Sequence, residues 1–403
     1  MKPQRIAIIG AGTAGLTTAA YLARQGHKIT LIERAQALAP VGAGILLQPS
    51  GLGVLSKLGC LDNLLQFGHR IDTLHGSTQS GRVIMRMAYA DLKQGVDTFG
   101  LGVHRAALCH VLNASLSAAA DQGGDHEVWF GCEVVSLEQN SKQASVHFAQ
   151  AGESQAAAFD AVLVANGSAS QLRPSALVNY DRQYPWGAMW LIREVPTSAP
   201  HLNHPKLQQR YGGSEFMAGI LPTGSTPFES DSDRLSFFWS LPVAAMADWR
   251  SADVDLAAWK ARVTNLWPEL DPLIAPISSA SELTPAVYRD VIMKRWGMGR
   301  VGVIGDAAHA MSPQLGQGAN MALLDAFALA EALERSESWP GVWVDFERQR
   351  AGSIRFYQAM SRLMTPFYQS SVPGLGLARD LALPVLYKNP WMRRHMTETI
   401  AGT

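Results

Sequence analysis

The chain has 403 residues, more than a single hydrophobic core usually serves, so we expect at least two subdomains. Its 34 lysines and arginines balance 34 aspartates and glutamates, which excludes a general electrostatic attraction to nucleic acid or to an anionic membrane. The three cysteines, Cys60, Cys109 and Cys132, lie far apart without zinc-type spacing. They indicate buried thiols in a reducing compartment, with no disulfide framework and no metal site.

An uncharged run from Ile6 to Ala23 follows two basic residues and could be mistaken for a targeting signal. Its glycines and threonines make it a poor bilayer span, and the spacing of those glycines has another explanation. We therefore expect a soluble, cytoplasmic protein, monomeric or homodimeric, without membrane contact.

The first predicted elements form a βαβ unit. An apolar strand from Arg5 to Ile9 is followed by a small-residue helix to about Gln25, with Gly26 as its stop, and by a second strand from Ile29 to Ile32. Parallel strands joined by a helix in this way are typical of nucleotide-binding folds.

The turn GAGTAG between the first strand and the helix carries the spacing G-x-G-x-x-G. In such a turn Gly10 permits the tight bend, Gly12 lets a pyrophosphate approach the backbone, and Gly15 lets helix and sheet pack closely. Glu33 ends the second strand, where a carboxylate can accept hydrogen bonds from a ribose. The candidate dinucleotide contacts are Gly10, Gly12, Ala14, Gly15, Glu33 and Arg34.

Strand-like runs from about Pro185 to Val243 predict a mostly antiparallel sheet. Side chains alternate between the two faces of a strand, so either face could line a flat apolar pocket. The alternatives are Trp186, Ala188 and Trp190 or Gly187, Met189 and Leu191, with Tyr211, Met217 or Phe216, and Phe238 or Trp239. We take Trp186, Trp190, Tyr211, Met217 and Phe238 as candidate substrate contacts.

The segment GDAAHAMSPQLGQGANMALLDA starts at Gly305, after a predicted strand, and enters a predicted helix from about Ala319 to Arg335. Asp306 lies at the strand end, where a carboxylate can accept a bond from a polyol hydroxyl. Residues 316–318 precede a helix N-terminus that favours negative charge. NAD has no further group for this second site, whereas FAD adds a ribityl chain and a ring that becomes anionic on reduction. The two sites together predict FAD.

The predicted fold class is α/β, with a Rossmann-type FAD-binding domain, an interleaved antiparallel-sheet substrate domain and a helical C-terminal segment. We expect the FAD-binding domain over residues 1–75, 100–180 and 290–340, the substrate domain over 76–99 and 181–289, and the C-terminal segment over 341–403. The tail from Ser371 to Met396 mixes apolar residues, prolines and arginines. It predicts a capping segment, with a dimer surface or a weak membrane contact as alternatives.

Taken together, these motifs resemble the class A flavin-dependent monooxygenases of the para-hydroxybenzoate hydroxylase and ubiquinone hydroxylase type. The late motif of that family, G-D-A-A-H, a proline, G-x-G-x-N and a D-A pair, matches Gly305 to His309, Pro313, Gly316, Gly318, Asn320, Asp325 and Ala326. The resemblance implies that Asp306 binds the ribityl chain and that Pro313 lies by the reacting edge of the flavin. It also implies a pyrimidine edge lined by Leu315, Gly316, Gln317, Gly318 and Ala319, with Asn320 as a further contact. His309 would lie near the ring, as a structural hydrogen-bonding residue rather than a general base.

Two earlier segments also resemble this family. The segment VGAGILLQPSGLGVLSKLG implies flavin contacts at Gly42, Ala43, Gly44 and Ile45. The segment VHRAALCHVL matches an R-x-x-L motif and implies that Arg105 binds the FAD phosphates, a role that suits its forked donors.

A third segment, DAVLVANGSASQLRP, resembles the family box D-x-x-x-x-A-D-G-x-x-S-x-x-R. Asp160, Gly167, Ser170 and Arg173 are in place, but Asn166 stands where the family has aspartate. Asparagine keeps an acceptor oxygen and loses the charge. We expect a hydrogen bond near the flavin pyrophosphate to survive, and any charge-dependent step with the nicotinamide cofactor to be altered.

The resemblance implies that NADH or NADPH reduces the flavin, that O2 then gives a C4a-hydroperoxide, and that one oxygen passes to a small aromatic or apolar substrate. The protein would supply orientation, dryness and charge stabilisation, and the sequence shows no acid–base dyad. A halogenase, a reductase of lipids or quinones, and a non-catalytic flavin-binding protein remain alternatives. The halogenase box W-x-W-x-I-P is absent, since the nearest pair is WGAMW.

Overall fold

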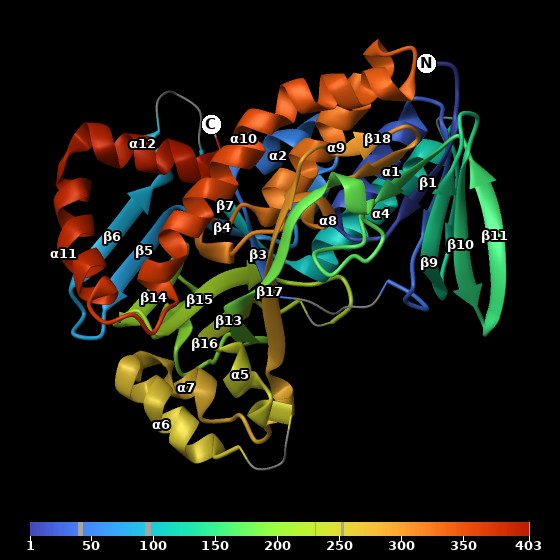
Figure 1. Ribbon diagram of the computed structural model, residues 1–403. Helices are drawn as coiled ribbons and strands as arrows, with labels where there is room; N and C mark the ends of the chain where they lie inside the picture. Colours follow the sequence, from blue (N-terminus) through green and yellow to red (C-terminus); the bar gives the residue numbers. More distant parts are fainter. Residues whose placement is uncertain (39–42, 93–97, 122, 230, 251–253, 403) are drawn as a thin grey trace.

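The computed structural model describes residues 1–38, 43–92, 98–121, 123–229, 231–250 and 254–402. Within these residues the strands group into one six-stranded sheet, one seven-stranded sheet and two three-stranded sheets. Figure 1 shows the large sheets side by side, with helices from the C-terminal third of the chain covering both. The predicted α/β class, with a parallel and an antiparallel sheet and C-terminal helices, is confirmed.

The six-stranded sheet has the order β18-β19-β12-β1-β2-β8. Its strands are β18 (Gly297–Met298), β19 (Val301–Val303), β12 (Ala161–Val164), β1 (Arg5–Ile9), β2 (Lys28–Ile32) and β8 (Asp125–Trp129). All neighbours run parallel except β18 and β19. The predicted βαβ unit is confirmed, with α1 (Thr13–Arg24) as its helix. Continuous burial on both faces explains the apolar runs of β1 and β12.

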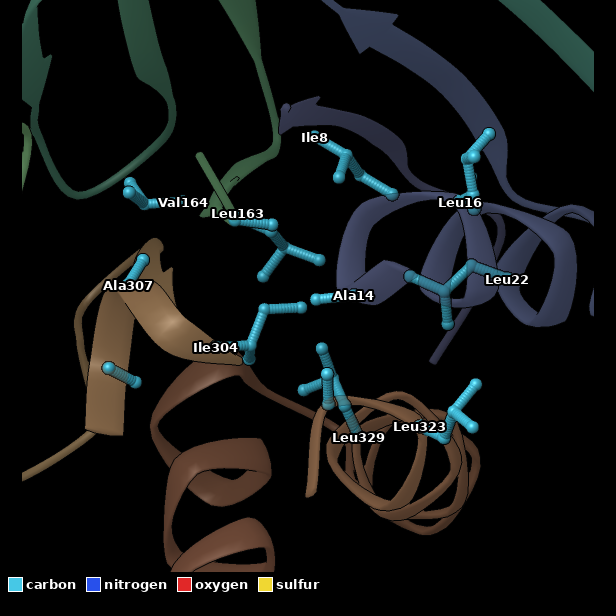
Figure 2. Packing of buried hydrophobic residues seen from close by; sticks show 14 of the residues in the cluster. Ile8, Ala14, Leu16, Leu22, Leu163, Val164, Ile304, Ala307, Leu323 and Leu329 are labelled. Atoms are coloured by element: carbon cyan, nitrogen blue, oxygen red, sulfur yellow. The ribbon is translucent and has the colours of Figure 1, made fainter. Parts of the chain in front are cut away.

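Three helices pack together beside this sheet. They are α1, α4 (Arg105–Asp121) and α9 (Gly318–Arg335), and the last confirms the helix predicted from about Ala319. Figure 2 shows Ala14 and Leu22 of α1 between the sheet and Leu323 and Leu329 of α9. Alanines and a glycine on α1 keep the helices close, and Ala14 near the start of α1 and Ala322 near the start of α9 both lie beside Gly305.

The two small sheets flank this core. One contains β9 (Cys132–Gln139), β10 (Ala144–Gln150) and β11 (Glu153–Phe159), all antiparallel, and it projects at one end of the molecule in Figure 1. The other has the order β3-β7-β4, with β3 (Gly44–Leu47), β7 (Gly100–His104) and β4 (His69–Ile71). Helices α2 (Pro49–Lys57) and α3 (Leu61–Leu65) follow β3.

The seven-stranded sheet has the order β17-β13-β16-β15-β14-β5-β6. Its strands are β17 (Thr284–Met293), β13 (Val178–Glu194), β16 (Arg234–Pro242), β15 (Phe216–Gly224), β14 (Lys206–Gly212), β5 (Thr73–Thr78) and β6 (Val83–Ala88). The antiparallel sheet predicted between 185 and 243 is therefore present, although β14 and β5 pair in parallel. The strands of this sheet come from residues 73–88 and 178–293. The domain boundaries expected from the sequence remain a prediction.

Each face of the seven-stranded sheet has its own cover. Helices α5 (Val243–Met246), α6 (Leu256–Leu266) and α7 (Asp271–Ile274) close one face through a cluster that includes Met189, Phe237 and Trp239. Helices α10 (Trp339–Tyr368), α11 (Leu375–Lys388) and α12 (Pro390–Ala401) close the other. The last helices thus cap the sheet, and none of the described helices combines the length and hydropathy that a bilayer crossing requires.

A buried carboxylate ties three segments together next to the turn after β19. Oδ2 of Asp325 on α9 accepts hydrogen bonds from the Gly305 amide at 2.9 Å and from Nε2 of His309 at 2.5 Å. Its Oδ1 accepts one from Nε of Arg350 on α10, also at 2.9 Å. Burial alone would raise the pKa of Asp325, but the opposite charges of His309 and Arg350 and these hydrogen bonds lower it to about 2.

We expect Asp325→Asn to destabilise the fold by about 3 kcal/mol, because it removes one partner of a buried ion pair. A carboxyl with a lowered folded-state pKa adds stability above its unfolded value near 3.8, and this stability is lost as the pH falls toward 2. Urea midpoints measured from pH 7 to pH 3 should therefore fall more steeply for the parent than for the variant. Glu331→Gln, in the exposed pair with Arg335, is the control and should change little. Equal midpoints for Asp325→Asn and the parent would contradict this account.

Candidate functional site

The glycine-rich turn after β1 has the geometry that only glycine allows. Gly10 has φ +104°, and a Cβ there would lie 2.7 Å from the carbonyl oxygen of Ala165. A Cβ on Gly15 would lie 1.8 Å from the Gly10 oxygen. Helix α1 starts from Gly12 as N-cap, and no described side chain caps its amides. Its N-terminus therefore offers free N–H groups to an anion.

Arg105 and Glu33 stand beside this turn. The guanidinium of Arg105, the first residue of α4, lies 3.6 Å from the position that a Cβ on Gly12 would take. Glu33 Oε2 accepts from the Ala11 amide at 2.8 Å, and Oε1 from the Ala35 amide at 2.9 Å, so each oxygen keeps acceptor capacity for a hydroxyl. Burial raises the pKa of the Cys109 thiol, while the nearby charge of Arg105 lowers it and that of Glu33 raises it. A cation for phosphate and an acceptor for ribose thus meet at one end of the site, and Arg34 beside Glu33 is exposed.

The second helix N-terminus belongs to α9, and Asp306 faces it. Gly305 has φ +60° and leads into the short helix α8 (Asp306–His309). Oδ1 of Asp306 lies 3.5 Å from the position of a Cβ on Gly318. Asp306 is exposed and has no hydrogen-bond or ion-pair partner within the described residues. Helix α9 begins without a side-chain cap and without an acid in its first turn.

The three sequence motifs converge at these two helix starts. A Cβ on Gly305 would lie 2.7 Å from Cβ of Ala14, so the late turn touches the beginning of α1. A Cβ on Gly10 would lie 2.8 Å from Cα of Asn166. Arg173 of the third motif donates a hydrogen bond to the Ala307 carbonyl oxygen. Segments around residues 10, 166 and 306 therefore form one cradle.

The segment after β19 is also held to β3. Asn320, fully buried, accepts from the Gln48 amide at 2.8 Å and donates to the carbonyl oxygens of Leu46 and Gly316. Nε2 of Gln317 donates to the Ile400 oxygen at 2.5 Å, which links this loop to the end of α12. The side chains of Asn320 and Gln317 thus position the loop, and the first turn of α9 keeps amides that no described side chain caps.

The remaining predicted flavin contacts fall around this loop. Gly316 has φ +61°, Leu315 is buried, and Ala319 is half-buried in the first turn of α9. On the other side, the oxygen of Ala43 accepts from the Arg105 amide, and the Gly44 amide donates to Ser236 Oγ at 3.1 Å. Ile45 is half-buried in β3, whereas Gly42 lies outside the described residues.

Pro313 and His309 occupy different environments. Pro313 is exposed and begins the 3-10 turn Pro313–Leu315, which lies in the loop between α8 and α9. His309 is buried and hydrogen bonded to Asp325, which agrees with a structural part for this residue. That either residue lies near a flavin ring stays a prediction.

The seven-stranded sheet settles which predicted side chains share a face. Trp190 of β13 lies opposite Phe238 of β16, with ring centroids 4.9 Å apart, and both belong to the cluster of Ala188, Tyr211 and Met217. The alternatives Met189, Leu191, Phe216 and Trp239 lie on the opposite face with α6 and α7. Trp186 is buried opposite Pro242, at the end of the pairing of β13 with β16. Because the first face joins β3 at Leu46, it is the one that borders the cradle.

The residues of the cradle fit FAD on their own chemistry. Two uncapped helix N-termini, a nearby guanidinium and a free carboxylate match a diphosphate, a polyol and an anionic ring. The sequence pointed to these groups. It gave no sign of Gln48 and Tyr89, whose side chains join at 2.5 Å beside the loop, or of the contact between Gln317 and Ile400.

The chain matches the FAD binding domain family over residues 4–338. It is 30% identical over 358 residues to the 3-amino-4-hydroxybenzoate 2-monooxygenase of Streptomyces cremeus, covering 83% of this chain and 80% of that protein. It is 29% identical over 374 residues to a probable 2-heptyl-3-hydroxy-4(1H)-quinolone synthase, AqdB2, of Rhodococcus erythropolis, covering 90% and 88%.

Among solved structures, a mutant of MHPCO, 2-methyl-3-hydroxypyridine-5-carboxylic acid oxygenase, aligns with a TM-score of 0.75 at 25% identity over 99% of this chain and 96% of that chain. The family match covers most of the chain and contains all three motifs of the cradle. The chain therefore belongs to the class A flavin-dependent monooxygenases, as its motifs predicted, and is an FAD-binding oxidoreductase.

Proposed function

We propose that the chain is an FAD-dependent, NAD(P)H-consuming monooxygenase that hydroxylates a small aromatic or similarly flat, apolar compound. The observation that carries the proposal is the pair of uncapped helix N-termini that meet where Gly305 touches Ala14. One suits a diphosphate and the other a ring that gains negative charge, and the apolar face at Trp190 and Phe238 borders the second.

Bound FAD would supply hydride acceptance from NADH or NADPH and the activation of O2, which side chains cannot provide. Gly12, the start of α1 and Arg105 hold the diphosphate, and Glu33 accepts from the ribose. Asp306 accepts from the ribityl hydroxyls. The amides that open α9 stabilise negative charge on the ring, and the apolar face excludes water from the reacting edge.

The named activities of the relatives favour hydroxylation over the other flavoenzyme alternatives. One relative is named for an aminohydroxybenzoate and another for an alkyl quinolone, and both compounds are small and ring-shaped. A halogenase is disfavoured because its tryptophan box is absent from the sequence. A reductase or a non-catalytic flavin protein would bind FAD but place no oxygen atom in a product.

The purified protein should carry FAD, visible in its absorbance, and should oxidise NADH or NADPH faster in the presence of a suitable phenol, quinolone or indole. Under 18O2 the product should contain one labelled oxygen atom, because the second is reduced to water. Stimulated oxidation that yields only hydrogen peroxide with every compound would count against hydroxylation of this panel. Conversion without label would favour the reductase.

Arg105→Ala should weaken FAD binding roughly tenfold or more, because a charge-assisted hydrogen bond to phosphate contributes about 1.5–3 kcal/mol. Titration of the apoprotein with FAD, followed by flavin fluorescence, measures this change. Arg348→Ala is the control, because Arg348 pairs with Asp345 on the surface of α10. An unchanged dissociation constant for Arg105→Ala would remove Arg105 from the phosphate site.

Asn166→Asp restores the charge of the family motif beside the Gly10 turn. We expect it to change the rate of flavin reduction by NADH or NADPH while FAD content stays the same, because the backbone at this position is retained. Anaerobic stopped-flow reduction separates this step from reaction with O2. Identical reduction rates for parent and variant would show that the lost charge has no effect on nicotinamide use.

A further inference from the structure

The face of the seven-stranded sheet that turns toward α10–α12 is apolar and aromatic. Its cluster includes Leu74, Ala188, Trp190, Tyr211, Met217 and Phe238, covered by side chains of the C-terminal helices. The cluster reaches the flavin cradle at two points. Leu46 belongs to it and precedes Gln48, and Ile400 packs on it while its carbonyl oxygen accepts from Gln317.

Arginines that border this cluster are already paired. Arg379 contacts Asp380 at 2.6 Å and lies 4.3 Å from the ring centroid of Tyr211. Arg362 pairs with Asp290 at 2.5 Å. Arg393 pairs with Asp91 at 3.3 Å. These cations are therefore compensated within the protein.

Strand alternation sends the other nearby cations to the opposite face. Tyr211 of β14 belongs to the apolar face, so Lys206 and Arg210 on the same strand point the other way. Burial, Lys206, Arg86 and Arg210 together lower the pKa of His75, so these groups gather on that opposite face. Within the described residues, the apolar face thus carries no uncompensated cation.

The tyrosines of this face add no charge. Burial raises the pKa of Tyr288 and of Tyr368 to about 12, and it raises the pKa of Tyr211 and Tyr387 as well. All four phenols therefore stay protonated at neutral pH. They can donate or accept hydrogen bonds but supply no positive charge to balance an anionic ligand.

Gln48, at the border of the face, is one of several residues with a polar atom that lacks a hydrogen-bond partner within the described residues, and Trp190 and Tyr387 of the face are others. Gln48 is fully buried, and its Oε1 accepts from the Tyr89 hydroxyl at 2.5 Å. Among the residues that the structure describes, its Nε2 has no hydrogen-bond partner, and it lies 3.9 Å from the position of a Cβ on Gly316, in the loop before α9. A buried donor left unpaired is costly, so an acceptor from a ligand accounts for it.

We propose that the substrate is an uncharged ring compound that offers a carbonyl or phenolic oxygen to Gln48 Nε2 and lays its apolar body against Trp190, Met217 and Phe238. Aromatic carboxylates are disfavoured, because a carboxylate on this face would be buried without a cation. This inference rests on the proposed function in one respect, namely that the substrate binds between the flavin loop and this sheet.

The test compares matched ring compounds that differ only in charge. The holoenzyme is titrated with 4-hydroxybenzamide against 4-hydroxybenzoate, and with 4-quinolone against 4-quinolone-2-carboxylate, following the perturbation of the flavin absorbance. We expect the neutral member of a pair to bind at least about tenfold more tightly, a difference of about 1.4 kcal/mol. Equal or tighter binding of the carboxylates would overturn the proposal, and so would the absence of any response to both neutral compounds.

Gln48→Glu tests the proposed hydrogen bond. Glutamate keeps an acceptor for Tyr89 but replaces the free donor by a carboxylate oxygen, so neutral ligands should bind roughly tenfold more weakly while FAD content is unchanged. Gln143→Glu is the matched comparison, because it makes the same change at an exposed position directly before β10, away from this face. Its effect on neutral ligands should be smaller. Weaker FAD binding by Gln48→Glu, with unchanged binding of the neutral ligands once the variant is saturated with FAD, would assign the donor to the cofactor and overturn this part.

The binding readout separates this inference from the proposed function. Preferential binding of neutral compounds without stimulated NAD(P)H oxidation would support the neutral site and count against the hydroxylase. Stimulated oxidation and hydroxylation of the carboxylates alone would support the hydroxylase and overturn the neutral site.

Discussion

The cradle depends on one buried charge, the carboxylate of Asp325. Its oxygens accept from an amide of the turn after β19, from His309 on α8 and from Arg350 on α10. A carboxylate without contact to solvent is tolerated only when such donors surround it, so the three segments cannot separate without a large energetic cost. The consequence for the site is geometric. With the Gly305 amide held, Asp306 turns outward beside the N-terminus of α9.

Helix packing adds to this tie by bringing together the N-termini of α1 and α9, the two proposed anion-binding positions. Helices α1 and α9 pack along their small and aliphatic side chains, and their N-terminal turns meet at Gly305, beside Ala14 and Ala322. Arg173 adds a third tie by donating to Ala307, so the loop that carries Asn166 follows the late motif. Apolar packing and buried ion pairs therefore hold together the segments that we propose bind one elongated cofactor.

Local rules made much of this predictable. The strand, turn and helix around Gly10 are decided by contacts within a few residues, and so is the glycine-led start of α9. Long-range ties were not predictable: Asn320 with Gln48, Gln317 with Ile400, and Arg173 with Ala307 join segments far apart in sequence. The sequence also left open which face of the sheet carries the predicted substrate contacts, for a related reason. Both faces of β13 are apolar, so the pattern alone could not say which helices cover which face.

The proposed cofactor and substrate halves of the site differ in the groups that they offer to a ligand. The proposed cofactor half offers amides and a guanidinium, which favour an anion, and carboxylates, which accept from hydroxyls. The proposed substrate half contains phenols that stay neutral and arginines that are already compensated, so we expect selection there to depend on shape and on single hydrogen bonds. Because Gln317 binds the end of α12 while its neighbours open α9, the last helix joins the two halves. A change in how α12 packs would therefore move Gln317 and the loop that precedes α9.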